Sequence, residues 1–240
     1  MLTPRGGVVT FRRRVAVPVA SAMSGGFCAE FDLPAVGLAP PAIRCPTGPT
    51  ATRDQLPARV PEVTVIADSV GTGLDYVAGG RARATGPWSA VFDLKVCRRL
   101  VAPPCPPNPP SALSVIRSLP SPGDVVVIHV GYNDAGSTYD IGQVMRALKA
   151  RGVRRVVWLN LQSIAPVAGS VNAAITRAES RYRWLQLADW NRHSAGHGWF
   201  VADRDHLTPS GATALAGFYR TEIARAIRAL RTPQVGSPAR

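Results

Sequence analysis

Short apolar runs alternate with amphipathic stretches through residues 62–231 of this 240-residue chain. The runs are rich in Val and Ile and are bounded by polar residues, which is typical of strands buried on both faces. The stretches between them have helical spacing, as in Ile141, Val144, Met145 and Leu148 at i, i+3, i+4 and i+7. The pattern predicts strands at 63–67, 90–96, 124–130, 153–159 and 185–188, and helices at 70–77, 111–119, 140–151, 171–181 and 209–230.

This alternation of strands and helices predicts a parallel sheet with helices on both faces. We expect residues 61–231 to form a three-layer α/β/α sandwich around a mostly parallel five-stranded sheet. Residues 1–60 are rich in Pro, Gly and Ala, and we expect a leader or a loosely ordered arm there, with a disordered tail at 232–240. Ligands of such sheets bind at the carboxyl ends of the strands, so the residues after each strand are the place to look for a site.

The chain has a formal net charge of +13, and its only lysines are Lys95 and Lys149. One interpretation is an anionic partner such as nucleic acid, an acidic polymer or a membrane surface. The other is a GC-rich genome, whose codons favour Arg, Ala, Gly and Pro. The arginines are scattered and no recognition helix is visible, so we favour codon bias and expect no nucleic-acid partner. An anionic polymer of the cell envelope stays open as a partner.

Four cysteines, Cys28, Cys45, Cys97 and Cys105, allow three disulfide pairings. The pairing that is local in sequence joins Cys28 to Cys45 and Cys97 to Cys105. Two disulfides predict an oxidising compartment, whereas four reduced thiols would fit a cytosolic protein. The spacing is not Cys-x-x-Cys and no histidine lies nearby, so no metal site is expected.

The targeting signal is ambiguous. Arg12 to Arg14, a short apolar segment and Ala20-Ser21-Ala22 have the order of a signal peptide, although Pro18 interrupts the segment. No apolar run reaches the ~18 residues that a membrane span needs. We expect a secreted or cell-envelope protein, and a cytoplasmic location or a different start codon stays open.

A serine follows the first predicted strand, in Ala67-Asp68-Ser69-Val70. At a strand-to-helix turn, the Ser69 hydroxyl is exposed and its backbone N–H lies at a helix N-terminus, where anionic charge is favoured. These are the needs of an acyl-transfer nucleophile. Asp-Ser after a strand is also an ordinary helix cap, so Ser69 alone does not decide between the two interpretations.

Two later strands are also followed by polar residues. Gly131 lets the backbone turn after strand 124–130, and the Asn133 side chain can donate an N–H to an oxyanion. In Asp203-Arg204-Asp205-His206, the first acid can fold back onto imidazole Nδ1 and leave Nε2 to take a serine proton. Alone, these segments also fit a turn, a solvated loop or a capping histidine. His193 and His197 lack the spacing of a zinc signature, and we interpret them as loop histidines.

Together, and in this order, the three segments resemble the sequence blocks of the SGNH hydrolase family, also called GDSL esterases, over about residues 62–230. The resemblance implies the flavodoxin-like fold of that family. It assigns a triad in which Ser69 is the nucleophile, His206 the base and Asp203 its support. The oxyanion donors that it implies are N–H groups of Ser69, Cys97 and Asn133. Asp68 and Gly131 would support the site.

The chain departs from the family pattern at two positions. Ala67 stands where the family commonly has the glycine of Gly-Asp-Ser, and Cys97 falls where its second block has a glycine. Cys97 can still offer its backbone N–H, and a Cys97–Cys105 bridge would stiffen that loop.

The resemblance implies hydrolysis of carboxylic esters through an acyl-enzyme, by a monomer that needs no metal or organic cofactor. The substrate would be a small-molecule, lipid or glycan ester, selected by loops such as 78–90, 98–112 and 134–140. Two alternatives stay open. One is an O-acyltransferase or O-acetyl esterase acting on a cell-envelope polysaccharide, and the other is a catalytically inactive, carbohydrate-binding relic of the fold.

Overall fold

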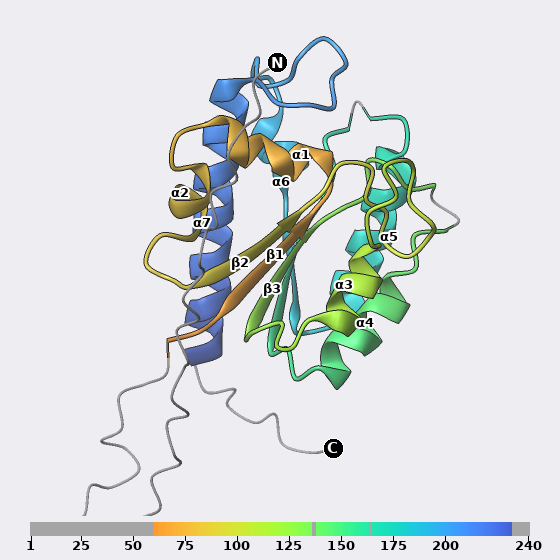
Figure 1. Ribbon diagram of the computed structural model, residues 1–240, viewed down its shortest axis with the longest axis vertical. Helices are drawn as coiled ribbons and strands as arrows, with labels where there is room; N and C mark the ends of the chain where they lie inside the picture. The colour runs from red at the N-terminus through yellow and green to blue at the C-terminus, as the bar shows by residue number, and fades with distance from the viewer. Residues whose placement is uncertain (1–59, 136–137, 164, 232–240) are drawn as a thin grey trace, which may run out of the picture. The chain divides into compact units, whose positions relative to one another are not determined.

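The structure is a computed structural model that describes residues 60–135, 138–163 and 165–231 (Figure 1). The leader predicted at 1–60 lies outside this part of the chain except for Val60, as do the predicted Cys28–Cys45 pair and the tail at 232–240. Among the described helices, none combines the length and the apolar character that a membrane crossing requires.

Five strands form one parallel sheet. They are β1 Val63–Ala67, β2 Ala90–Leu94, β3 Val125–His129, β4 Arg155–Leu159 and β5 Leu185–Ala188, in the order β2-β1-β3-β4-β5. Each neighbouring pair is parallel. This is the strand order of flavodoxin-like sheets, in which the direction of winding switches between β1 and β3. The predicted sandwich is confirmed, with a sheet that is entirely parallel.

Helices cover both faces of the sheet (Figure 1). Successive strand residues point to opposite faces, so Val126 and Ile128 pack in one core and Val125 and Val127 in the other. The first core lies under α3 Ala112–Ser118, α4 Ile141–Ala150 and α5 Ala168–Arg181, and the second under α2 Gly80–Thr85 and α7 Pro209–Arg231. Because both faces are buried, the strands are continuously apolar, as the sequence pattern predicted.

The predicted helices are present with ends shifted by a few residues, but two helices were missed. One is α2, which lies in the predicted loop 78–90 and buries only small residues, so it has no apolar stripe in the sequence. The other is α6 Trp190–Ser194, where Asp189 Oδ1 accepts the backbone N–H of Arg192 at 3.0 Å. His193 therefore lies in a short helix and not in the loop where we expected it.

The helix after β1 is short. It comprises α1 Ser69–Thr72 and continues as the 3₁₀-helix η2 Gly73–Tyr76. A Cβ on Gly71 would lie 2.3 Å from Ala67 Cβ, so only glycine allows α1 to turn back so closely on the end of β1. A Cβ on Gly73 would lie 3.5 Å from Leu207 Cδ1, which places the serine turn against the residue that follows His206.

Candidate active site

Asp68 joins the carboxyl ends of the neighbouring strands β1 and β3. Its Oδ1 accepts the backbone N–H of Val70 at 3.2 Å, which caps α1. Its Oδ2 accepts the backbone N–H groups of Gly131 at 3.0 Å and Tyr132 at 3.1 Å. The side chain is completely buried. Asp68 thus ties the loop after β3 to the serine turn, and the two residues predicted to support the site, Asp68 and Gly131, are bonded to each other.

Burial raises the pKa of Asp68 to about 6, because removal from water disfavours the carboxylate. The three backbone N–H groups oppose this shift, and the positive charge of His206 opposes it further. The close approach of Gly73 to Leu207 places the helix that begins at Ser69 next to the residue that follows His206.

Ser69 is the first residue of α1 and is partly buried. The cap of this helix is the carboxylate of Asp68 and not the serine hydroxyl. Within the described residues, the hydrogen bonds of this turn engage the Ser69 carbonyl, which accepts the Thr72 hydroxyl at 2.6 Å, and leave the Ser69 hydroxyl without a partner. The Asp-Ser segment does cap a helix, as one interpretation held, but the capping residue is Asp68 and the Ser69 hydroxyl takes no part.

Asp203 folds back onto His206, as their spacing predicted. The distance from Asp203 Oδ2 to His206 Nδ1 is 2.8 Å, and both side chains are about half exposed. Asp203 Oδ1 accepts the backbone N–H groups of Asp205 and His206, each at 2.9 Å. The N–H and the ring of His206, followed by the Asp205 N–H, lower the pKa of Asp203 to about 2. The carboxylate is thus ionised at neutral pH and suited to accept a hydrogen bond from Nδ1–H of His206. This bond leaves Nε2 as the nitrogen that can take a proton.

A β-bridge between Phe200 and Leu207 closes the loop that carries this pair, and the Val201 N–H donates to the His206 carbonyl at 2.9 Å. In the described chain, no hydrogen bond joins the Ser69 hydroxyl to the His206 ring. Such bonds are often loose before substrate binds and tighten in the complex. The structure brings the two turns together, and their catalytic roles stay a prediction.

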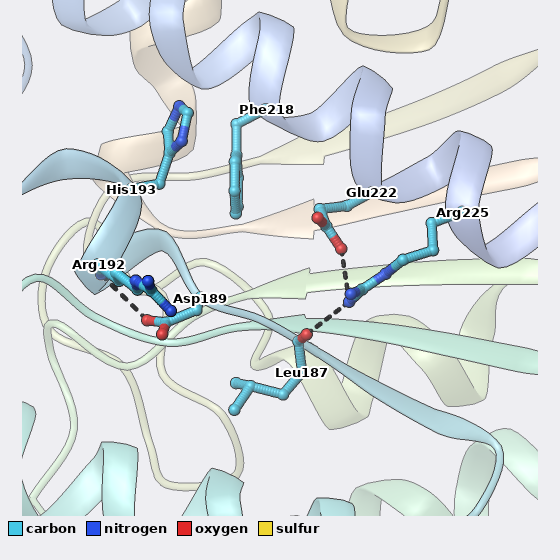
Figure 2. A pocket seen from close by; sticks show the side chains of 7 residues that line it. All are labelled: Leu187, Asp189, Arg192, His193, Phe218, Glu222 and Arg225. Atoms are coloured by element: carbon cyan, nitrogen blue, oxygen red, sulfur yellow. Dashed lines mark hydrogen bonds and ion pairs between the residues drawn. The ribbon is translucent and has the colours of Figure 1, made fainter.

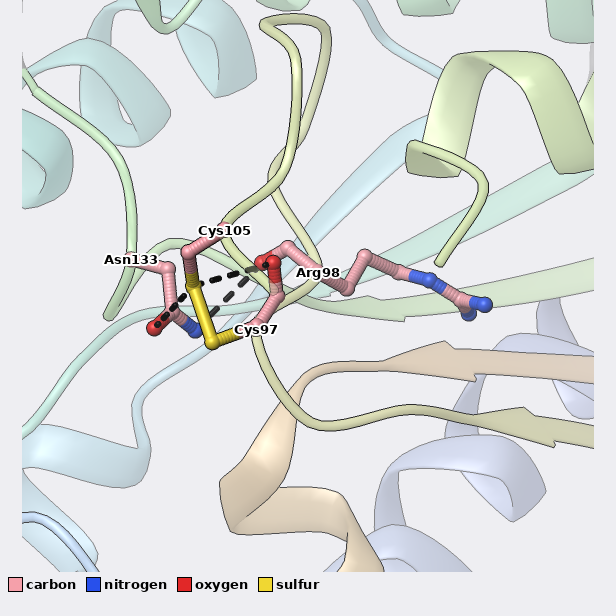
Figure 3. The surroundings of a disulfide bond; sticks show 4 residues. All are labelled: Cys97, Arg98, Cys105 and Asn133. Atoms are coloured by element: carbon pink, nitrogen blue, oxygen red, sulfur yellow. Dashed lines mark hydrogen bonds between the residues drawn. A yellow bond between two sulfur atoms is a disulfide. The ribbon is translucent and has the colours of Figure 1, made fainter. Parts of the chain in front are cut away.

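The other two predicted oxyanion donors, Cys97 and Asn133, meet at a second loop (Figure 3). The predicted disulfide between Cys97 and Cys105 is present, and the Cys105 sulfur lies 3.9 Å from Asn133 Oδ1. Asn133 Nδ2 donates to the Arg98 carbonyl at 3.4 Å. Cys97 has a φ of 58°, a left-handed conformation that glycine adopts freely and other residues adopt at a cost. The backbone at Cys97 thus has the shape that a glycine would suit.

Two buried residues that sequence reasoning missed hold this loop. Arg98 is fully buried and donates to the Asp93 carbonyl at 2.6 Å, the Asp93 carboxylate at 2.7 Å and the Pro110 carbonyl at 3.1 Å. Both carboxylate oxygens of Asp134 accept the Leu100 N–H, at 3.0 and 3.1 Å. Burial raises the pKa of Asp134 to about 7. The only signal in the sequence was that Asp134 ends the Gly-Tyr-Asn-Asp segment.

Two pockets lie on the described part of the chain, and one of them is next to the histidine turn. One, of about 520 Å³, borders the Asp203–His206 turn. The other, of about 440 Å³, lies between β5, α6 and α7 (Figure 2). In the second pocket Arg225 is already paired, with Glu222 at 2.7 Å and the Leu187 carbonyl at 2.7 Å. The first pocket is therefore the better candidate for a substrate. The described part of the chain holds no group of three or more His, Cys, Asp or Glu side chains that could bind a metal ion.

Comparison with known proteins adds support for the fold. No family model and no curated protein matches the sequence. One crystal structure, 14% identical, superposes with a TM-score of 0.53 over 69% of this chain and 96% of its own. The salicylyl-acyltransferase SsfX3 from a tetracycline biosynthetic pathway, 16% identical, gives 0.50 over 75% of this chain and 58% of its own. Est24, a carbohydrate acetylesterase from Sinorhizobium meliloti, 13% identical, gives 0.48 over 68% and 98%. At these identities the likeness to the first two structures concerns the fold alone, and the third superposition carries no argument.

Proposed function

We propose that this protein is a serine ester hydrolase of the SGNH type, which cleaves carboxylic esters through an acyl-enzyme on Ser69. The observation that carries the proposal is the Asp203–His206 pair, held at 2.8 Å, together with a serine whose hydroxyl takes no part in capping its helix. If the histidine segment were only a solvated loop, it would not need the Asp203–His206 contact. If Ser69 were only a helix cap, its hydroxyl would be bonded within its helix. The order of the three sequence segments and the flavodoxin-like strand order support the same conclusion.

In the proposed reaction the Ser69 hydroxyl attacks the ester carbonyl while His206 Nε2 takes its proton. Asp203 holds Nδ1–H and stabilises the imidazolium. The backbone N–H groups of Ser69 and Cys97 and the Asn133 amide would donate to the oxyanion. His206 returns the proton to the departing alcohol, and a water activated by the same imidazole then releases the acid and restores Ser69.

Hydrolysis is favoured over transfer to another acceptor because the base is open to water. About half of the His206 side chain and half of the Asp203 side chain are exposed. An enzyme that transfers acyl groups must keep water away from its acyl-enzyme intermediate. A base that is half exposed leaves this intermediate open to attack by water. The Cys97–Cys105 disulfide supports a secreted or cell-envelope location for this activity.

A serine-directed fluorophosphonate probe tests the proposal directly. We expect the probe to add to the protein once, and peptide mass spectrometry to place it on Ser69. Ser69→Ala should take up no probe, whereas Ser180→Ala, which removes an exposed hydroxyl on α5, should label like the wild type. An unlabelled wild-type protein would favour the alternative of an inactive carbohydrate-binding relic.

The disulfide loop gives a second test of the same site. Without the bridge, the eight-residue separation predicts a loss of roughly 2–3 kcal/mol in the free energy of unfolding. In urea titrations Cys97→Ser/Cys105→Ser should lose this amount, and Cys97→Gly/Cys105→Ser should lose somewhat less, because glycine is unstrained in the left-handed backbone of position 97. Only glycine adopts the backbone of position 97 without strain, so the Gly variant should hydrolyse 4-nitrophenyl acetate about 10-fold faster than the Ser variant. Equal rates would show that the position of this backbone N–H is unimportant.

A further inference from the structure

The pocket that borders the histidine turn has two kinds of wall. Its volume of about 520 Å³ lies within the range of small-molecule sites. One wall is apolar and is formed by Phe200, Val201 and Ala202, which immediately precede Asp203. Val201 is 41% exposed, which is high for a large apolar side chain. The remaining lining residues are polar or small: Gln162, Ser194, Gly196, His197 and Arg204.

Arg204 is the charged arginine among the residues that line this pocket. It lies between the proposed triad residues Asp203 and His206, and its φ is 65°. Glycine or asparagine would adopt this left-handed conformation more readily, so the backbone of this arginine is strained where it lines the pocket. Strain of this kind is concentrated at functional sites.

The charge of Arg204 is not neutralised by the pocket. No Asp or Glu is among the residues that line it. Asp203, the preceding residue, is bonded to His206, and in the part of the chain that the structure describes no ion pair joins Arg204 to any acid. The pocket beside β5 is the opposite case, since its Arg225 is paired with Glu222 (Figure 2). Among the described residues, the Arg204 guanidinium therefore has its hydrogen-bonding capacity available for a ligand.

We propose that this pocket binds a carboxylate group of the substrate, with Arg204 as the residue that selects it. A guanidinium binds a carboxylate through two parallel hydrogen bonds, and the Phe200–Ala202 wall would cover the short apolar body that carries the carboxylate. The proposal rests on the proposed ester hydrolysis, because it names the class of ester that the same site prefers. That class is esters with a free carboxylate in the acyl part or in the alcohol part.

Paired esters distinguish the two positions of the charge. The acyl pair is 4-nitrophenyl butyrate and mono-4-nitrophenyl glutarate, and the alcohol pair is phenyl acetate and 4-acetoxybenzoate. In at least one of the two pairs, the wild-type enzyme should have a higher kcat/KM for the anionic ester than for the neutral ester. Arg204→Asn keeps a residue that tolerates the left-handed backbone, and it should lower the anionic-to-neutral ratio of kcat/KM by about 10–100-fold. The matched control Arg117→Gln removes an exposed charge on α3 and should leave the ratio unchanged. An unchanged ratio in Arg204→Asn would overturn the proposal.

Binding of the carboxylates glutarate and 4-hydroxybenzoate separates this proposal from the proposed function. By calorimetry, Ser69→Ala should bind at least one of them about 10-fold more tightly than Ser69→Ala/Arg204→Asn does. If the wild type hydrolyses none of the esters but binding depends on Arg204, the hydrolase proposal fails and the carboxylate pocket stands. If the esters are hydrolysed and neither rate nor binding depends on Arg204, the pocket proposal fails. If there is neither hydrolysis nor binding, both proposals fail.

Discussion

Replacing Ser69 with alanine is expected to lower kcat for 4-nitrophenyl acetate by at least about 10⁴-fold, because no acyl-enzyme can then form. The protein should remain as stable as the wild type. Its helix is capped by Asp68, and the described hydrogen bonds do not use the Ser69 hydroxyl. The free energy of unfolding should therefore change by less than about 0.5 kcal/mol. A large loss of rate with unchanged stability would identify a chemical role and not a structural one.

Two further variants sharpen this result. His206→Ala should lose about as much activity as Ser69→Ala, and the double variant should lose little more, since residues that act as a unit are not additive. Ser180→Ala should keep the wild-type rate. A Ser69→Ala enzyme within 10-fold of the wild-type rate would rule Ser69 out as the nucleophile and require another group for the reaction.

Much of the fold was predictable because a parallel sheet buried on both faces leaves a strong pattern in the sequence. The strand at 124–130 is nearly all apolar for this reason, and β3 occupies Val125–His129 within it. The Asp203–His206 contact was predictable for a different reason. It is local, and three residues of spacing suffice to bring a carboxylate back to an imidazole.

The features that sequence reasoning missed depend on contacts between distant segments. Arg98 is one of many arginines in the sequence, and only the fold shows that it is buried and bonded to Asp93 and Pro110. The role of Asp134 depends on Leu100, which lies 34 residues away. The carboxylate pocket depends on Arg204 lying beside Ser194 and His197. Burial and pairing of a charged residue are set by its tertiary neighbours, which a single sequence does not specify.

Replacing Asp68 with alanine is expected to lower the free energy of unfolding by about 3 kcal/mol or more at pH 4, where the folded protein holds this carboxyl protonated and removal of a buried charge does not offset the lost hydrogen bonds. The change leaves the buried N–H groups of Val70, Gly131 and Tyr132 without an acceptor, and each unpaired donor costs roughly 1–3 kcal/mol. Asp140→Ala is the matched control. Asp140 also caps a helix, accepting the Gln143 N–H at 2.9 Å, but its side chain is exposed. Asp68 differs because it is buried and also accepts two N–H groups from the loop after β3. Its loss should cost about 1 kcal/mol in the same urea titration.

The pH dependence of stability tests the same carboxylate through Asp68→Asn, which cannot ionise. The pKa of Asp68 is about 6 in the folded protein against 3.8 for an exposed aspartate. As the pH rises from about 3 to 7, the unfolded chain therefore releases this proton first, and folding loses roughly 3 kcal/mol from this group. Asp134, with a pKa of about 7, acts in the same direction. Between pH 4.5 and 7.5 the wild type should thus lose more stability than Asp68→Asn does. Parallel pH profiles of the two proteins would show that burial does not raise the pKa of Asp68, and that its three N–H partners fully compensate the charge.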